Sequence, residues 1–184
     1  MSATSASLHG QRVLLCVCGG IAAYKAADLV RRLRDAGAEV SVAMTDNAQR
    51  FVSATTFQAL STNAVRTSLW DAAAEAAMGH IELARWAGRV LVAPATANTL
   101  AKLAHGMADD LVSTLCLATS APLTVAPAMN HRMWLHPATR ANVALLRERG
   151  VRVLEPVDGP LAEGESGPGR LQEPADIVAA MAAS

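Results

Sequence analysis

Short apolar runs alternate along the chain with longer, alanine-rich stretches in which the apolar positions recur at helical spacing. The run at 12–18 is almost continuously apolar and stops at a glycine pair, as is typical of a parallel strand covered on both faces. The stretch at 21–36 has helical spacing and ends at Gly37, a common residue just past a helix end. The same alternation predicts further strands at 39–44, 89–93, 123–126 and 151–154, and further helices at 51–60, 97–104, 109–119, 137–150 and 176–182.

This alternation predicts an α/β fold: a doubly wound, mostly parallel sheet with helices on both faces, in the manner of a Rossmann or flavodoxin-like three-layer sandwich. Ligands of such sheets bind outside the carboxyl ends of the strands. We therefore expect a binding site where four strands end, at residues 19–20, 45, 94–99 and 127–130.

The length of 184 residues suits a single domain, which we expect at 11–184 after a flexible N-terminal tail at 1–10. The segment at about 156–174 is rich in glycine, proline and glutamate and has no apolar period. It is either a linker or a mobile flap over the site, because long segments without regular structure are often functional.

Composition and charge argue against several classes of function. Hydrophobic residues make up 52% of the chain and charged residues 17%, which argues against disorder. The net charge is zero and aromatic residues are only 3%, so nothing favours a nucleic-acid or membrane-surface partner. No apolar run is long enough to span a membrane, and the first ten residues do not resemble a signal peptide.

Cysteine usage points to a reducing compartment. The chain has three cysteines, an odd number, and two of them, Cys16 and Cys18, lie in a strand that we expect to be buried. We therefore expect a cytoplasmic protein without disulfides. The Cys16-x-Cys18 pair has no matching pair at ligand spacing elsewhere, so we expect no metal site.

Two of the loops could bind a cofactor. Gly19-Gly20 lies at the first strand-to-helix turn, where glycine lets an anion such as a phosphate approach backbone N–H groups. The pair is equally compatible with a plain tight turn, since it matches neither the dinucleotide fingerprint nor the P-loop. The segment 94–99 (PATANT) carries small hydroxyl and amide side chains that could hydrogen-bond a ring edge or a phosphate, or Thr96 could simply cap a helix.

Two further segments carry candidate reactive groups. The segment 127–134 (PAMNHRMW) follows a strand, and Asn130 there could bind a carboxylate or an amide through its NH2 group. Otherwise this segment is a strand-to-helix turn whose Met and Trp side chains belong to the core. His80 follows Gly79 at a predicted helix start, where a side chain can point into a cleft, although a lone histidine is more often structural.

Taken together, these segments resemble the homo-oligomeric flavin-containing cysteine decarboxylases. That family includes phosphopantothenoylcysteine decarboxylases and the peptidyl-cysteine decarboxylases of ribosomal peptide natural products. The resemblance runs from residue 12 to about residue 174 and rests on the glycine turn and three motifs in the family's order: the histidine segment 80–86 (HIELARW), the flavin loop 94–99 and the PxMNxxMW motif at 127–134.

The resemblance implies that FMN is the cofactor, with its phosphate at Gly19, Gly20 and the helix that follows. It implies cofactor contacts at Gly19, Gly20, Ile21, Thr45, Asn47, Ala48, Thr96, Asn98, Thr99, Ala128 and Met129. It also implies a homotrimer with each flavin near a subunit boundary, and often a homododecamer. His80 and Asn130 would then share one site, to which neighbouring subunits could contribute.

The chemistry of the family explains why these residue types are needed. Oxidation of a cysteine side chain to a thioaldehyde by FMN allows the neighbouring carboxylate to leave as CO2, and the electron transfer belongs to the cofactor. By this resemblance His80 is the base or proton partner, because its ordinary pKa suits proton transfer at neutral pH. Asn130 would hold the substrate carboxylate, and the substrate-binding set would be Asn130, Met133, Glu163 and Gly164.

One position departs from the resemblance. Glu163 stands where phosphopantothenoylcysteine decarboxylases carry a flap cysteine that helps to reduce the enethiol, and no cysteine follows Cys116. On this reading we also expect no fused synthetase domain of the kind that the bacterial enzymes often carry. The missing cysteine and this expectation both favour a reaction that stops at the enethiol, as in the peptidyl-cysteine decarboxylases, with an outside oxidant for the reduced FMN.

The main expectation is therefore oxidative decarboxylation of the C-terminal cysteine of a precursor peptide to an aminoenethiol. The alternative is decarboxylation of phosphopantothenoylcysteine in coenzyme A biosynthesis, with Glu163 or Glu165 as another proton donor. An alternative of another class is a non-catalytic flavin-binding regulatory subunit, which would need neither His80 nor Asn130. Flavin prenyl transfer on a similar scaffold is disfavoured by the PxMNxxMW motif.

Overall fold

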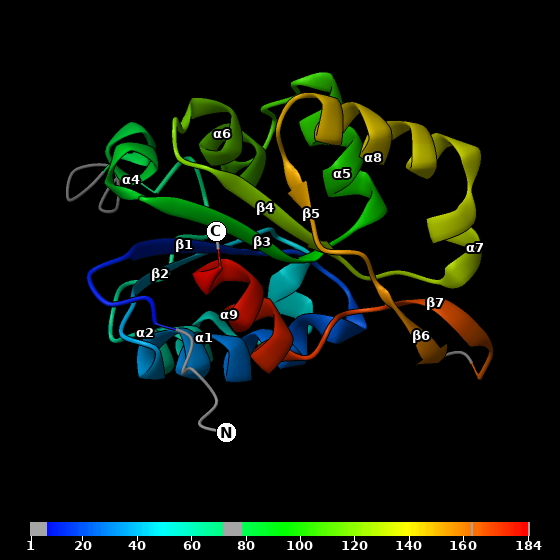
Figure 1. Ribbon diagram of the computed structural model, residues 1–184. Coiled ribbons are helices and arrows are strands. Elements are labelled where there is room, and N and C mark those ends of the chain that lie inside the picture. Colours follow the sequence, from blue (N-terminus) through cyan, green and yellow to red (C-terminus); the bar gives the residue numbers. More distant parts are fainter. Residues whose placement is uncertain (1–6, 72–78, 163, 184) are drawn as a thin grey trace.

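A computed structural model describes residues 7–71, 79–162 and 164–183. Its centre is a five-stranded parallel sheet with the order β2-β1-β3-β4-β5, shown in Figure 1. The strand order reverses between β1 and β3, and such a switch point opens a crevice at the carboxyl ends of the strands. The doubly wound α/β fold predicted from the sequence is confirmed, with strands β1 (Arg12–Val17), β2 (Glu39–Met44), β3 (Arg89–Ala95), β4 (Leu123–Pro127) and β5 (Arg152–Val153).

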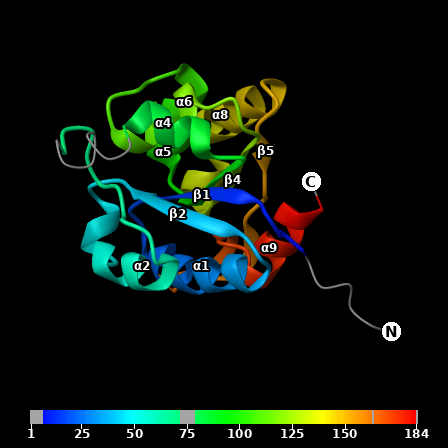
Figure 2. The ribbon, with the colours of Figure 1, turned by 90° about the vertical axis from the view of Figure 1, so that its left-hand side faces the viewer.

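Helices cover both faces of the sheet, as Figures 1 and 2 show from two directions. One face carries α1 (Lys25–Asp35), α2 (Ala54–Ser61) and α9 (Pro174–Ala182), with the short turns η1 (Ile21–Tyr24) and η2 (Ala48–Arg50) leading into this layer. The other face carries α4 (His80–Trp86), α5 (Ala97–His105), α6 (Leu111–Ala118) and α8 (Pro137–Glu148), and the short α7 (His131–Leu135) lies at its end.

Two hydrophobic cores, one on each side of the sheet, explain the unbroken apolar run of β1. Val13 and Leu15 point into the core beneath α1 and α9, whereas Leu14 and Cys16 point into the core beneath α5 and α6. All four side chains are fully buried. Burying an aliphatic side chain of this size stabilises the fold by about 1.5–3 kcal/mol, so a polar residue on either face of β1 would be costly.

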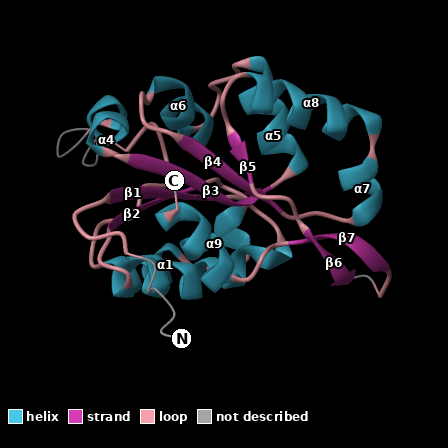
Figure 3. Cartoon of the chain, viewed as in Figure 1, coloured by secondary structure: helices cyan, strands magenta, loops and turns pink. Residues whose placement is uncertain are grey.

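The segment that lacks an apolar period forms regular structure after all. Strands β6 (Val157–Pro160) and β7 (Ser166–Arg170) pair as an antiparallel hairpin at the end of the molecule near α7, as Figure 3 shows. Glycine permits the hairpin to dock closely: a Cβ atom on Gly169 would lie 2.2 Å from the carbonyl oxygen of Met129. The amide of Met129 donates to the Gly169 carbonyl at 3.0 Å, so the hairpin is held by backbone contacts that leave no hydrophobic period in the sequence.

The folded chain begins earlier than the boundary expected at residue 11. Leu8 is buried, and its amide donates to the carbonyl oxygen of Ala36 at 2.8 Å. Apolar contact beneath α1 therefore extends into the stretch that composition alone assigned to a tail. Within the described residues, the helices are all too short or too polar to cross a lipid bilayer.

Candidate active site

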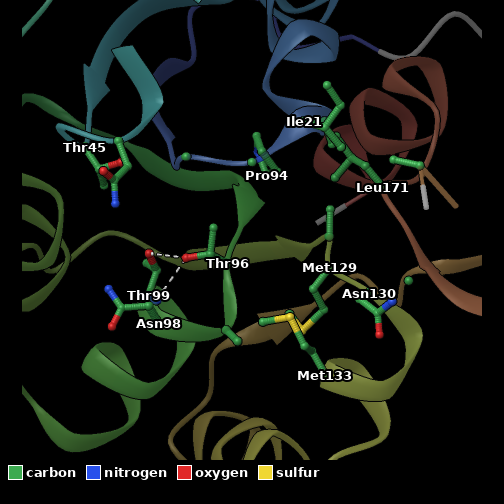
Figure 4. Close-up of a pocket in the computed structure, with 18 of the residues that line it drawn as sticks. Ile21, Thr45, Pro94, Thr96, Asn98, Thr99, Met129, Asn130, Met133 and Leu171 are labelled. Carbon is green, nitrogen blue, oxygen red and sulfur yellow. Dashed lines mark hydrogen bonds between the residues drawn. The ribbon is translucent and has the colours of Figure 1, made fainter. Parts of the chain in front are cut away.

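A cavity of about 980 Å³ opens at the carboxyl ends of the central strands, where the strand order reverses. Its volume is at the upper end of the range that small-molecule and cofactor sites occupy. The four loops predicted from the sequence meet here, and Figure 4 shows their side chains around the cavity. Ten of the cofactor contacts that the resemblance implies line it: Gly19, Gly20, Ile21, Thr45, Asn47, Thr96, Asn98, Thr99, Ala128 and Met129. Ala48, which the resemblance also implied, is buried behind the wall.

The glycine pair has two distinct roles. A Cβ atom on Gly19 would lie 2.5 Å from the Cβ atom of Asn47, so only glycine lets the first two loops touch. Gly20 has extended backbone and precedes η1, and a Cβ atom there would meet nothing within 4 Å. The first N–H groups of a helix have no helical acceptor, so this turn offers the donors that a phosphate group requires.

The flavin loop combines the two interpretations that the sequence left open. Thr96 caps α5, because its hydroxyl accepts a hydrogen bond of 3.2 Å from the amide of Thr99, and it also lines the cavity. The hydroxyl of Thr99 donates to the Cys18 sulfur at 3.3 Å. Burial raises the pKa of the Cys18 thiol to about 12, although the hydrogen bond from Thr99 works in the opposite direction. Cys18 is therefore a neutral thiol behind this polar wall.

Asn130 is oriented by the helix that it caps. Its Oδ1 atom accepts a hydrogen bond of 2.8 Å from the amide of Arg132, at the start of α7. The Nδ2 group consequently faces the hairpin, where it donates to Oε2 of Glu165 at 3.5 Å. An amide whose oxygen is already engaged and whose nitrogen faces a carboxylate suits the predicted task of holding a substrate carboxylate.

Glu165 joins the hairpin to this segment through three side chains. Besides Asn130, its carboxylate lies 3.3 Å from Nδ1 of His131 and 3.5 Å from Nη2 of Arg132. The sequence placed Glu165 in the flap but did not indicate these contacts, which depend on how the hairpin folds back. Among the other substrate-binding residues, Met133 lines the cavity, whereas Gly164 is exposed at the hairpin tip and does not. Glu163 lies outside the described residues.

His80 is not part of the cavity wall in the single chain. It is the first residue of α4, follows Gly79 as predicted, and is half-buried. The α4 helix packs against α6, away from the hairpin that contacts Asn130. The arrangement within one chain does not bring His80 and Asn130 together, and a site completed by neighbouring subunits stays a prediction.

Several charged residues that line the cavity were missed by the sequence analysis. Lys102, Asp109 and Asp110 line it together, and the Lys102 ammonium contacts both carboxylates, at 2.8 Å for Asp109 and 2.6 Å for Asp110. The hydrogen bonds that the ammonium donates, to Asp109 first and then to Asp110, raise the pKa of Lys102. Lys25 and Arg170 line the cavity elsewhere. Of these charged residues, only Lys25 could have been expected at the cavity from the sequence, because it lies about one helical turn after the glycine pair. Within the described ranges, we find no cluster of His, Cys, Asp and Glu side chains arranged to hold a metal ion.

Comparison with known proteins identifies the family. The model of the family described as Flavoprotein matches residues 1–184. The chain belongs to this flavoprotein family. It is 53% identical over 173 residues to the coenzyme A biosynthesis bifunctional protein CoaBC of Vibrio vulnificus and 54% identical over 172 residues to that of Escherichia coli. Each match covers 94% of this chain but only 43% and 42% of the relative, so the chain spans about two-fifths of the length of these curated relatives.

Solved structures agree with this assignment. A PPC decarboxylase mutant complexed with pantothenoylaminoethenethiol superposes with a TM-score of 0.81 at 32% identity, covering 93% of this chain and 96% of that one. The FMN-dependent cysteine decarboxylase SpaF superposes with a TM-score of 0.79 at 33% identity, covering 97% and 100%. The predicted family, its FMN cofactor and its decarboxylase class are confirmed by these findings.

Proposed function

We propose that this flavoprotein decarboxylates phosphopantothenoylcysteine. The observation that carries the proposal is the identity of 53–54% to the CoaBC proteins over nearly the whole chain, against 33% to the cysteine decarboxylase SpaF. This corrects the order of preference in the sequence analysis, where the missing flap cysteine favoured a peptide substrate. One substituted position weighs less than similarity over 94% of the chain.

The residues of the cavity fit FMN and a cysteine carboxylate. Gly20 and the start of η1 would hold the phosphate, and Thr96 and Asn98 offer hydroxyl and amide groups to the polar edges of the cofactor. FMN, when bound, accepts two electrons from the substrate's thiol-bearing carbon and so makes the loss of CO2 possible. Met129 and Met133 add apolar surface to the wall of this cavity.

Asn130 orients the substrate in this proposal. Its NH2 group donates a hydrogen bond to the substrate carboxylate. When that carboxylate leaves as neutral CO2, it no longer accepts a strong hydrogen bond from the amide. A neutral amide suits this task because a permanent cation would stabilise the carboxylate and oppose its loss. His80 would accept the proton of the substrate thiol as the thiol-bearing carbon is oxidised, if a neighbouring subunit brings His80 to the cavity.

The last proton of the reaction requires a donor other than cysteine. Glu165 contacts His131 and Arg132 and anchors the hairpin. We assign the donor role to Glu163, because it occupies the sequence position of the flap cysteine. The homotrimer, the homododecamer and the cytoplasmic location remain predictions.

Mass spectrometry of the reaction products tests the proposal. Purified holoenzyme is incubated separately with phosphopantothenoylcysteine and with a peptide that ends in cysteine. We expect the phosphopantothenoyl substrate to lose CO2 alone. Loss of CO2 and two hydrogens would mean that the reaction stops at the enethiol and that Glu163 does not replace the cysteine. Turnover of the peptide with no turnover of phosphopantothenoylcysteine would overturn the proposal in favour of the peptidyl reaction.

A further inference from the structure

Two cationic side chains, Lys25 and Arg170, line the cavity with one carboxylate between them. Oε1 of Glu173 lies 2.7 Å from Nζ of Lys25 and 3.5 Å from Nη2 of Arg170. The Lys25 side chain is only 14% exposed, so its ammonium is held in place and poorly solvated. The group has a formal charge of +1, and two cations share one oxygen atom of a single carboxylate.

Three separate elements build this group. Lys25 begins α1, Arg170 ends β7 and Glu173 precedes α9. The guanidinium of Arg170 lies across Gly159, where a Cβ atom would be 2.6 Å from Nη1. Glycine at this position, with a φ of +149°, therefore allows Arg170 to reach the cavity.

The cationic side chains Lys25 and Arg170 line the same cavity as Asn130. Figure 4 shows Ile21 and Leu171 on the side of Met129 and Asn130, opposite Thr45 and Asn98. Lys25 lies one helical turn after Ile21, and Arg170 is adjacent to Leu171 in the chain. Asp46 and the pair Asp109 and Asp110, which contact Lys102, line the cavity as well.

The distribution of charge around the cavity favours an anionic ligand group in one place and disfavours it in another. The group of Lys25, Arg170 and Glu173 has a formal charge of +1, whereas Lys102 with Asp46, Asp109 and Asp110 sums to −2. Charges that face a partly dehydrated cavity interact more strongly than charges in bulk water, so an anionic ligand group gains free energy beside Lys25 and Arg170 and loses it beside the aspartates. The proposed function gives the FMN phosphate the backbone N–H groups of Gly20 and η1, and Thr96 and Asn98 the polar edges of the cofactor, so we assign the cationic side chains to the substrate.

We propose that Lys25 and Arg170 form an anion subsite that binds the phosphate of the substrate while Asn130 binds its carboxylate. This inference rests on the proposed function and names the feature that selects the substrate class: an anionic group at each end. Glu173 offsets one of the two positive charges when no ligand is present and competes with the phosphate for the cations. A peptide that ends in cysteine has no second anion at this place and gains nothing from the subsite.

The experiment compares phosphopantothenoylcysteine with pantothenoylcysteine, which differ only in the phosphate. For each holoenzyme the ratio of the two kcat/KM values is measured at fixed ionic strength. We expect the wild type to prefer the phosphorylated substrate, and Lys25→Gln and Arg170→Gln each to lower the ratio by about 10–100-fold, as expected for one charge-assisted hydrogen bond. Lys25→Arg should preserve most of the preference.

Glu173→Gln is expected to improve binding of the phosphorylated substrate, an effect that a folding defect would not produce. Removal of the competing carboxylate should lower the KM for the phosphorylated substrate by about two- to fivefold, the range of a partly exposed ion pair. Arg32→Gln is the matched control, because Arg32 also lies on α1 and pairs with Asp28 in solvent. In Arg32→Gln, the ratio of the kcat/KM values for the two substrates should equal that of the wild type.

The FMN phosphate is the other group that this cationic pair could hold. Fluorescence titration of each apoprotein with FMN separates the two sources of phosphate. If the Lys25 and Arg170 variants lose FMN affinity and keep the wild-type substrate ratio, the pair belongs to the cofactor and the subsite is refuted. Equal use of both substrates by the wild type refutes the subsite but leaves the proposed decarboxylation intact. Release of CO2 from neither substrate refutes the proposed function, and the subsite with it.

Discussion

The side-chain nitrogen of Asn130 donates a hydrogen bond of 3.5 Å to the carboxylate of Glu165, across the gap between the PxMNxxMW motif and the hairpin. A carboxylate of the protein thus lies against the group that is predicted to bind the carboxylate of the substrate. The two segments are linked by a contact that the substrate would replace, which couples the hairpin to binding.

Asn130→Asp separates the two functions of this residue. Aspartate caps helices about as well as asparagine, so the amide of Arg132 keeps its acceptor and the free energy of unfolding should change by less than about 1 kcal/mol. The variant replaces the NH2 donor by a second carboxylate facing Glu165, and we expect decarboxylation to fall at least about 100-fold, as for loss of a group that orients the reacting atoms. Thermal melts and a CO2-release assay check both parts. Decarboxylation near the wild-type rate would show that the amide does not bind the substrate carboxylate.

The adjacent glycines predict opposite effects for the same substitution. Gly19→Ala would place a methyl group 2.5 Å from Asn47, and we expect a loss of stability of about 1–3 kcal/mol from overpacking. Gly20→Ala meets no protein atom within 4 Å, so the protein should fold normally but bind FMN at least about tenfold more weakly, because the methyl group occupies space beside the phosphate donors. Chemical denaturation of the apoproteins and FMN titration distinguish the two. Wild-type FMN affinity in the Gly20 variant would place the phosphate elsewhere.

The three cysteines should be unreactive in the folded protein. Cys16, Cys18 and Cys116 are free and buried. A hydrogen bond to Cys116 and then burial raise the pKa of Cys16, and burial raises that of Cys18 to about 12, so the thiolate form that reacts is scarce at pH 8. A thiol reagent such as DTNB should label none of the three within minutes under native conditions and all of them in guanidinium. Rapid native labelling of one thiol would contradict the closed core beneath the cavity.

Acid sensitivity is expected from Asp110. Burial raises the pKa of this carboxyl, but hydrogen bonds from Lys102 and Ser113 outweigh burial and leave the pKa below its ordinary value. A depressed carboxyl pKa stabilises the fold above the pKa of the unfolded chain, near 4, and this contribution is lost as the pH falls through the lower folded-state pKa. We therefore expect wild-type stability to decline below about pH 4 and Asp110→Asn to reduce that decline.

Denaturation midpoints between pH 3 and pH 7 measure this effect. Asparagine still caps α6, so the variant isolates the charge from the cap. Asp109→Asn is the matched control, because its carboxylate contacts the same lysine but its side chain is 57% exposed. The control should alter the acid limb less than Asp110→Asn. If the denaturation midpoints of the wild type and Asp110→Asn fall equally below pH 4, other carboxylates cause the acid sensitivity.

The predictions from periodicity succeeded where structure depends on local sequence. The strand at 39–44 coincides with β2, and Ser53 caps α2 as its sequence position indicates, accepting a hydrogen bond from the amide of Thr55 at 3.2 Å. The hairpin at 157–170 was missed because its strands bury no apolar stripe. Its stability comes from backbone pairing and from glycines that fit against Met129, and neither leaves a repeating pattern in the sequence.

The sequence by itself determined the alternation of strands and helices, and hence the edge of the sheet at which the cofactor loops meet, because a parallel sheet aligns the carboxyl ends of its strands. Only the tertiary structure decided which charges share the cavity. Lys25 and Glu173 are 148 positions apart, and their 2.7 Å contact requires α1, β7 and α9 to pack together. The tertiary structure also left His80 outside the cavity wall of the single chain. Electrostatic interactions depend on distance in space, which periodicity along the chain does not encode.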